Sequence, residues 1–490
     1  MYLSLVGLCL LAVVGLYFVN NPLHHGGWFL TRRFINWFPL GMTYAFLYMA
    51  RYNLSVAKNA LGAAMTNEDF GLIFAAGTAT YAFSFLLNGP LVDRIGGKRG
   101  ILLAAGGTAV ANLLLGVLTY LTLTGRLHGR RVVAFSGLYA LNMYFQSFGA
   151  VSVIKVKAYW FHVRERGVFG AIFGALVSFG VYFAFDWSEA ILDLARTGPR
   201  AASGWLAELF RAVFAVSGSP GEAVWAVFFV PAAILLGWCG LNVWLVKDTP
   251  EEAGFPPFDP ADASSGHMDE PFSARALFKS IFTSRLMLLF AAVELTSGVM
   301  RNGVLQWYTV YAKEMPQAGA EFVTAHWGLL LCLFGIIGGF AGGLLSDRCF
   351  QSRRGPPTVL LCASMVVLAG MMALGMGRAP LLVGGAALLI ALAVTGVHTL
   401  LTASAAADFG GRKATATSAG IVDGCVYLGS SLQSVCVGHL VGFGWVWWPL
   451  FLAPFAALGA VIAWQFWSAL PVATRRYLNE VEHKPVPGKG

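Results

Sequence analysis

Long apolar runs separated by short polar loops dominate the pattern of this 490-residue chain. A helix needs about 20 apolar residues to cross the roughly 30 Å hydrocarbon core of a bilayer, and it satisfies its own backbone hydrogen bonds there. The pattern therefore predicts an all-α protein that crosses a membrane many times. Twelve runs fit this description, near residues 34–58, 67–91, 100–122, 132–158, 168–192, 222–246, 282–311, 325–346, 357–377, 380–406, 415–438 and 444–469.

A further apolar run, MYLSLVGLCLLAVVGLYFVN, precedes the twelve at residues 1–20. A cleaved signal peptide carries its positive charge in front of the apolar run, whereas here Arg32 and Arg33 follow it. We therefore expect residues 1–30 to form an extra N-terminal transmembrane helix with its N-terminus outside. A cleaved signal is the alternative.

A longer polar stretch at 247–278 divides the twelve spans into two sets of six. Its Pro, Gly and Asp content is typical of a linker that builds no core. The sequence thus predicts one six-helix bundle at 31–246, a second at 279–470 and a tail at 471–490.

Positive charges predict the orientation, because Lys and Arg are enriched in cytoplasmic loops. They cluster in the loops DRIGGKRG, HVRERG, DRCFQSRR and GGRK and in the tail, which we expect to be cytoplasmic with the linker. The loop TGRLHGRR at 124–131 should face outward yet also holds three arginines. Because the basic residues lie between helices, the net charge of +9 indicates membrane topology rather than nucleic acid binding.

Composition supports a membrane protein, since 12% of the residues are charged compared with roughly 25% in soluble proteins. The seven cysteines are scattered without paired spacing, so neither a disulfide framework nor a metal site is predicted. The sequence contains no Walker loop, Gly-x-Ser-x-Gly elbow or His-Glu-x-x-His motif. Nothing therefore supports an enzyme, a cofactor or an ATP-driven pump.

A short motif, Gly-x-Leu-x-Asp-Arg, occurs after the second span and again after the eighth. Its glycines and charged residues are Gly89, Asp93, Arg94, Gly343, Asp347 and Arg348. Glycine lets two helices approach closely, and the charged pair can cap and bond across a loop, as a moving joint requires. The recurrence indicates one six-helix unit present twice, with this motif at a conformational gate.

The first copy, continued to Arg99, nearly completes the loop signature of the major facilitator superfamily, and residues 31–470 resemble that superfamily. The resemblance implies two six-helix bundles with pseudo-twofold symmetry around a central site, and alternating access by rocking. Several stretches look more specifically like the organophosphate:phosphate antiporters, which include glycerol-3-phosphate and glucose-6-phosphate transporters. They are ARYNLSVAKNAL, FQSFGA, WFHVRERG, KDTPEEAGFPP, RNGVLQWYTVYAKE and GVHTLLTASAAADFGGRKATATSAG.

Arg51 in the first span and Arg301 in the seventh lie within apolar runs. A charge inside the membrane is costly and usually faces a cavity, and a guanidinium binds phosphate through paired hydrogen bonds. In the family that the chain resembles, arginines at these two positions converge on the phosphate, so the resemblance implies the same role here. Alternatively, Arg51 holds a helix pair together, and Arg301 is neutralised by Glu294, two turns back on the same helix face.

Polar side chains continue along the first span on both sides of Arg51. Tyr44, Tyr48, Arg51, Ser55 and Lys58 follow at spacings of three and four residues, which places them on one helix face. We expect this stripe to line the central site, with the tyrosine hydroxyls donating to phosphate or sugar oxygens. Interfacial positions for the tyrosines, and a position beyond the membrane for Lys58, are the alternatives.

Four further polar residues are candidates. The resemblance implies binding roles for Gln146 and Lys155, which match a glutamine and an arginine of the family, although Lys155 also fits a loop-end charge. His398 and Asp423 are ionisable groups inside spans, where such groups are functional by default, with helix packing as the alternative. We expect Glu294 and His398 to line the substrate-binding site. Asp423 and Glu294 are also candidates for proton coupling, because a carboxylate near arginine can change its charge with occupancy.

The chain departs from the family pattern at supporting polar positions. Tyr52 stands where the family usually has a lysine after the first arginine. Phe85 and Val177 stand at the positions of a lysine and a histidine that some members carry. These departures leave the particular substrate open.

The sequence therefore predicts a monomeric secondary transporter in the cell membrane, the inner membrane if the protein is bacterial. Its expected cargo is an anionic, phosphorylated small organic solute, exchanged for inorganic phosphate. Two alternatives remain. One is a proton-coupled transporter whose arginines bind organic carboxylates, and the other is a sensor that binds sugar phosphate without transporting it.

Overall fold

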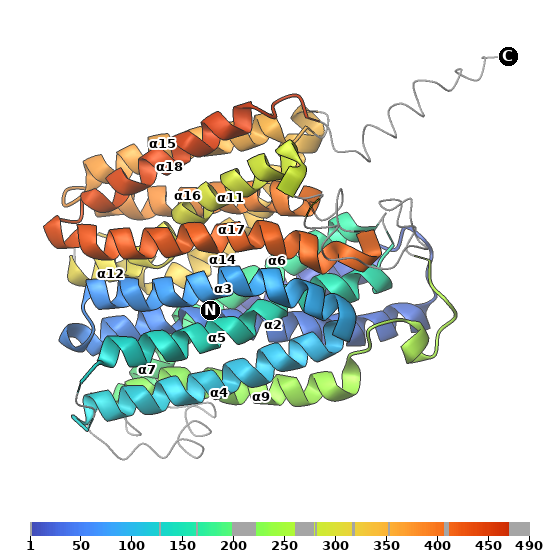
Figure 1. The fold of residues 1–490 in the computed structure, drawn as a ribbon, viewed down its shortest axis with the longest axis horizontal. Coiled ribbons are helices and arrows are strands. Elements are labelled where there is room, and N and C mark those ends of the chain that lie inside the picture. Colours follow the sequence, from blue (N-terminus) through green and yellow to red (C-terminus); the bar gives the residue numbers. More distant parts are fainter. Residues whose placement is uncertain are drawn as a thin grey trace.

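The computed structural model is a bundle of long helices that run side by side (Figure 1). It describes residues 2–126, 129–162, 165–197, 222–259, 279, 282–315, 319–350, 353–405 and 411–469. All regular secondary structure within these residues is helical. The prediction of an all-α protein with many membrane spans is confirmed.

Each predicted span coincides with one helix or with consecutive helical segments. The first six are α2 (Gly27–Leu61), α3 (Asn67–Ile95), α4 (Gly97–Leu123), α5 (Arg131–Trp160), α6 (Arg166–Tyr182) with η3 (Phe183–Trp187) and α7 (Ser188–Thr197), and α9 (Ala226–Leu245). The last six are α11 (Arg285–Leu305) with α12 (Trp307–Glu314), α14 (Trp327–Leu344), α15 (Gly355–Gly375), α16 (Pro380–Ala405), α17 (Gly411–Leu440) and α18 (Trp447–Trp464).

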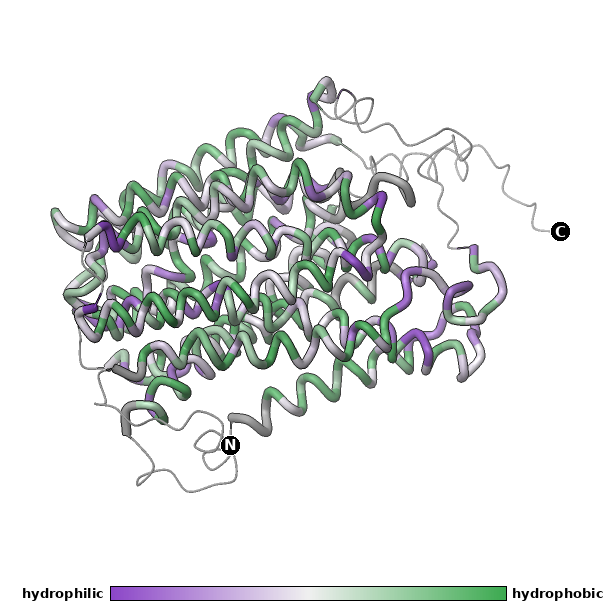
Figure 2. Tube along the Cα trace, turned by 60° about the horizontal axis from the view of Figure 1, so that its bottom comes forward, coloured by the Kyte–Doolittle hydropathy of each residue, from purple (hydrophilic) through white to green (hydrophobic). Residues whose placement is uncertain are grey.

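Ten helices in the described part of the chain are long and apolar enough to cross a membrane. Helices α2 and α5 are the predicted spans outside this set, and both carry buried polar side chains, among them Arg51 and Gln146. The hydrophilic positions otherwise gather at the end of the bundle that carries residues 247–259 (Figure 2). We call this the linker end and the opposite end the Lys58 end. The linker end is the one predicted to be cytoplasmic.

Helices from the two halves of the chain occupy the two sides of the bundle, blue to green on one side and yellow to red on the other (Figure 1). They meet where α3 lies beside α17. A β-carbon on Gly71 of α3 would lie 2.4 Å from the carbonyl oxygen of Ser434 on α17, so only glycine permits this approach. The close packing brings side chains from both halves into one region.

Residues 247–259 of the predicted linker pack against the first half of the chain. The Lys247 amide donates to the side-chain oxygen of Asn36 at 2.7 Å, and the Lys98 amide at the start of α4 donates to Asp248 at 2.7 Å. Burial raises the pKa of Asp248. The rest of the predicted linker, apart from Lys279 just beyond it, and the tail at 471–490 lie outside the described residues.

Helix α1 (Tyr2–Val19) coincides with the first apolar run and lies along the edge of the bundle (Figure 2). The Tyr17 hydroxyl donates to the Leu30 carbonyl at 2.8 Å and accepts from Nε of Arg33 at 3.0 Å. Arg33 in turn donates to both carboxylate oxygens of Glu165, each at 2.9 Å. A buried ion pair therefore anchors α1 to α2 and to the loop that follows α5.

This ion pair also shifts the titration of Glu165. Burial acts to raise the pKa of the Glu165 carboxyl, but the hydrogen bonds and charge of Arg33 outweigh it, so the pKa lies below its ordinary value of 4.5. A carboxyl with a lowered folded-state pKa contributes stability above its unfolded pKa. That contribution is lost as the pH falls through the folded-state pKa.

We expect Glu165→Gln to reduce the free energy of unfolding by about 3–5 kcal/mol at neutral pH, because a buried arginine loses its counter-charge. Thermal unfolding in detergent across a pH series measures the effect. The difference from wild type should shrink as the pH falls below 4.5.

Tyr17→Phe is the matched control, since it removes one hydroxyl from the same cluster and is expected to cost about 1 kcal/mol. Equal losses for the two variants would contradict the assigned ion pair. So would a Glu165→Gln defect that persists unchanged into acid.

Candidate substrate-binding site

Arg51 lies in the interior of α2 and is fully buried. Its Nε donates to the side-chain oxygen of Gln146 on α5 at 2.8 Å, and one terminal nitrogen donates to the Tyr81 hydroxyl on α3 at 2.9 Å. The other terminal nitrogen donates to the Tyr427 hydroxyl on α17. All three acceptors are neutral. The guanidinium is therefore held in position by partners that leave its positive charge available to an anion.

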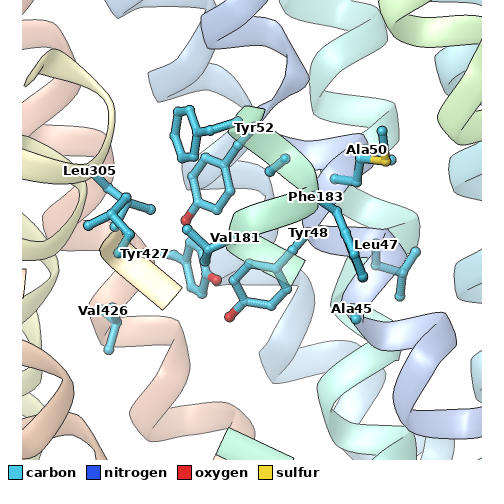
Figure 3. Packing of buried hydrophobic residues seen from close by; sticks show 14 of the residues in the cluster. Ala45, Leu47, Tyr48, Ala50, Tyr52, Val181, Phe183, Leu305, Val426 and Tyr427 are labelled. Atoms are coloured by element: carbon cyan, nitrogen blue, oxygen red, sulfur yellow. The ribbon is translucent and has the colours of Figure 1, made fainter. Parts of the chain in front are cut away.

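Tyr48 connects the two predicted arginines. Its ring lies 4.6 Å from the Arg51 guanidinium carbon, and its hydroxyl accepts from a terminal nitrogen of Arg301 on α11 at 3.1 Å. Arg301 is partly exposed. The two arginines come from different halves of the chain and converge on opposite parts of one tyrosine. Figure 3 shows Tyr48 with Tyr52 and Tyr427, whose hydroxyl groups face the same region between α2 and the C-terminal helices.

Tyr81 and Tyr427 are site residues that the sequence analysis missed. Their rings lie 4.1 Å apart across the contact between α3 and α17, and both hydroxyls accept from Arg51. The available signal was the position of Tyr81 near the middle of its span, away from the membrane interface where tyrosine is common. Which arginine it contacts depends on helix packing that a single sequence does not contain.

A chain of buried amide side chains supports Gln146 from behind. Gln146 donates to Asn142 at 3.2 Å, Asn112 donates to Asn142 at 3.1 Å, and Asn53 donates to Asn112 at 2.8 Å. These residues lie on α5, α4 and α2 and are fully buried. Because each amide orients the next, the Gln146 oxygen is fixed toward Arg51 before any substrate binds.

Tyr52, which stands where the family has a lysine, makes a different connection. Its hydroxyl donates to the side-chain oxygen of Asn302 on α11 at 3.0 Å, and Asn302 donates to the Ser430 hydroxyl on α17. This contact joins α2 to two helices of the other half through neutral groups. The position therefore contributes a hydrogen bond between the halves instead of a positive charge.

A second polar group lies nearer the linker end. Glu294 on α11 and His398 on α16 are 3.2 Å apart, and Nε2 of His398 lies 3.9 Å from Asp423 on α17. The Thr402 hydroxyl donates to Asp423 at 3.3 Å. We call these four residues the acid–histidine cluster. The cluster brings together Glu294, His398 and Asp423, whose contact with one another was not predicted from the sequence.

The alternative that Glu294 neutralises Arg301 is not what the structure shows, because the Glu294 carboxylate is paired with His398. Residues two turns apart share a helix face, but His398 reaches Glu294 from a neighbouring helix at hydrogen-bond distance. Arg301 is bonded to Tyr48 instead.

Lys155 and Tyr44 are the remaining predicted binding residues. Lys155 is ion-paired with Asp93 of the loop motif at 2.9 Å. This ion pair joins α5 to α3 at the linker end of the N-terminal half. Lys155 lies on α5, more than two turns beyond Gln146, which agrees with the alternative that it is a loop-end charge.

The ring of Tyr44 stacks on Phe173 of α6 at 5.3 Å, and it meets the ring of Tyr48 edge to face at 5.4 Å. Tyr44 therefore borders the arginine pair through Tyr48.

The predicted gate motif lies at the linker end in both copies. Gly89 is buried and Arg94 is exposed at the end of α3. Gly343 is half-buried near the end of α14, and Arg348 is exposed in the segment that follows it. The backbone of Asp347 belongs to η6 (Leu345–Cys349), and its side chain lies outside the described residues.

Comparison with known proteins places the chain in a family. The model of the Major Facilitator Superfamily matches residues 40–434. The glycerol-3-phosphate transporter of Bacillus subtilis is 26% identical over 423 residues, which cover 82% of this chain and 85% of that protein. The membrane sensor protein UhpC of Salmonella typhimurium is 24% identical over 437 residues, which cover 87% and 89% of the two chains.

A solved structure shares the fold. A bacterial homologue of the human lysosomal transporter Spinster, in an inward-facing and unoccupied conformation, aligns with a TM-score of 0.65 and 13% identity over 92% of this chain and 98% of that chain. The relatives are consistent with the organophosphate:phosphate antiporters that the sequence resembles. The family match extends from the first of the twelve spans into the eleventh. The chain therefore belongs to the major facilitator superfamily, and it is a multi-pass membrane transporter.

Proposed function

We propose that the protein exchanges a phosphorylated small organic solute, of the glycerol phosphate or sugar phosphate class, for inorganic phosphate. Arg51 and Arg301 hold the phosphate group of either anion. The exchange proceeds by alternating access within a single chain, which already contains both six-helix halves, so the functional unit is a monomer.

The observation that carries this proposal is the convergence of Arg51 and Arg301 on Tyr48. Each guanidinium presents a planar set of N–H donors that matches the oxygens of a phosphate. Each tyrosine hydroxyl that accepts from an arginine still has its own O–H to donate. A phosphate offers more acceptor oxygens than a carboxylate, so this set of donors favours phosphate.

The contacts between the halves support alternating access. At the Lys58 end, Glu314 on α12 accepts from Lys58 at 2.9 Å and from Asn67 at 3.0 Å. Asp186 in η3 accepts from the Gly328 and Leu329 amides at the start of α14, at 2.8 and 3.0 Å. These bonds join the two halves at one end of the bundle. They support a conformation closed at the Lys58 end, which an exchange cycle must break and reform.

Two other functions fit the same arginines. A sensor would bind the sugar phosphate without moving it, and a relative that is 24% identical is named a membrane sensor protein. A carboxylate transporter would bind a substrate group that offers two acceptor oxygens to the arginines, fewer than a phosphate offers. Exchange of labelled phosphate separates both from the proposed function, because neither predicts it.

We expect wild-type protein in proteoliposomes loaded with phosphate to take up labelled inorganic phosphate. Arg51→Ala and Arg301→Ala should each reduce this exchange about a hundredfold or more, since losing two charge-assisted hydrogen bonds costs about 3 kcal/mol or more. Arg126→Ala is the matched control, because this arginine is exposed in a loop. Absence of exchange in folded wild-type protein would exclude the proposed function.

Tyr48→Phe tests the link between the two arginines. The variant keeps the ring against Arg51 but removes the hydroxyl that binds Arg301, so we expect the apparent affinity for phosphate to fall about tenfold, equivalent to about 1.4 kcal/mol. Tyr120→Phe, at an exposed tyrosine of α4, should change it less than twofold. Competition between labelled and unlabelled phosphate in proteoliposomes measures both. Equal effects of the two substitutions would argue against a specific role for Tyr48.

Glu314→Gln tests the closure at the Lys58 end. The substitution removes the charge that binds Lys58, and because Glu314 is 38% exposed the expected effect is only a several-fold shift toward the state open at that end. In a variant without native cysteines, the measurement is labelling of Ser55→Cys by a membrane-impermeant maleimide.

Glu321→Gln is the control for this experiment, because Glu321 lies near the same end and accepts from a local amide, that of Gly319, at 2.8 Å. An unchanged labelling rate in Glu314→Gln, or an equal increase in the control, would show that this ion pair does not hold the end closed.

A further inference from the structure

The acid–histidine cluster is not among the residues proposed to bind the phosphate group, but it lies close to them. Glu294 lies two turns before Arg301 on α11, about 10 Å along the helix axis. Asp423 lies one turn before Tyr427 on α17. Both carboxylates are therefore nearer the linker end than the residues that contact Arg51. An anion that enters or leaves by that end passes this cluster.

One atom of the cluster lacks a partner. The Glu294 side chain is fully buried, its Oε2 lies 3.2 Å from Nδ1 of His398, and its Oε1 has no hydrogen-bond partner among the described residues. A buried carboxylate with an unsatisfied oxygen is costly, and a neutral carboxyl at the same place is far less so. Glu294 is thus a site where a bound proton would relieve the cost of burial.

The groups around Glu294 come from four helices. The nearby charged or titratable groups are His398, Asp423, Arg301, Cys362 and Cys425, on α16, α17, α11, α15 and α17. Helix α18, which packs on α11, carries no titratable side chain between Trp447 and Trp464. Two carboxylates, Glu294 and Asp423, therefore lie on either side of His398 and close to Arg301.

Binding of a phosphate dianion adds negative charge close to this cluster. The anion brings two negative charges to the arginine pair, and like charges nearby favour the protonated form of a carboxyl. The low dielectric of the interior makes the effect stronger than in water. The unsatisfied oxygen of Glu294 is an acceptor at which such a proton can be placed without breaking an existing hydrogen bond.

We propose that Glu294, with His398 and Asp423, forms a proton-binding site that takes up one proton from solution each time the arginine pair binds a phosphate dianion. An O–H bond forms at the Glu294 carboxylate, and the proton returns to solution when the anion leaves. Each anion then crosses with one proton more than it carries in solution. This inference rests on the proposed function, because it requires that phosphate binds at the arginines.

The test is isothermal titration of the purified full-length protein with inorganic phosphate, in pairs of buffers that differ in ionisation enthalpy, at mildly alkaline pH. Buffer dependence of the heat gives the number of protons taken up for each phosphate bound. We expect about one proton more for wild type than for Glu294→Gln. Any proton that the phosphate itself gains on binding is the same for both proteins, because both keep the two arginines. It therefore cancels when the two proton numbers are subtracted.

The affinity for phosphate gives a second readout. For wild type the affinity should decrease about tenfold for each unit of rising pH, because one proton is bound with each phosphate. In Glu294→Gln this tenfold change per pH unit should be absent. Glu294→Asp keeps a titratable group and should retain the proton uptake. Glu68→Gln is the matched control, since Glu68 also pairs with a histidine, His439 at 3.8 Å, but both side chains are exposed.

The outcomes separate the two proposals. Equal proton uptake by wild type and Glu294→Gln, with phosphate binding intact, overturns the proton site and leaves the exchange function standing. If Glu294→Gln does not fold, wild type that binds phosphate without any proton uptake overturns the proton site by itself. Failure of wild type to bind phosphate overturns both.

Discussion

The structure depends on one expensive feature, the charge of Arg51 inside a bundle that crosses a membrane. A guanidinium in that position needs hydrogen-bond acceptors, and three other helices provide one each, to Nε and to the two terminal nitrogens. Helices α3, α5 and α17 must each place one side chain within hydrogen-bond distance of α2. The amides behind Gln146 and the close approach at Gly71 follow from this requirement, because a small displacement of any helix would leave a buried donor unsatisfied.

The two halves meet this constraint in different ways, although they repeat one motif. The N-terminal half surrounds its arginine with neutral tyrosines and amides, whereas the C-terminal half combines Arg301 with Glu294, His398 and Asp423. The first arrangement fixes a positive charge in place. The second can change its charge by gaining or losing protons. An anion between them would contact both, so its binding is sensitive to how the halves approach and to the charge of one of them.

Much of this organisation could be predicted from the sequence, and the reasons for the misses are physical. Apolar runs gave the positions of the helices, since hydrocarbon tolerates few alternatives, and the cost of a buried charge identified Arg51 and Arg301. Side-chain contacts between different helices could not be predicted, because a single sequence does not show which helices pack together. Helical spacing suggested Glu294 as the partner of Arg301, but His398 reaches it from α16. Tyr81 and Tyr427 were not predicted as site residues, because tyrosine is common in membrane helices and at membrane interfaces for reasons unrelated to binding.

The departures from the family pattern fit the charge balance of the site. Tyr52 stands in place of a lysine and forms a neutral hydrogen bond with Asn302, while Phe85 packs against Tyr81 with ring centroids 4.5 Å apart. Neither position adds a positive charge. Arg51 and Arg301 are therefore the two fixed positive charges of the candidate site, with the acid–histidine cluster close to Arg301. If a dianion binds at the arginines, a proton gained by this titratable cluster is a source of further compensating charge.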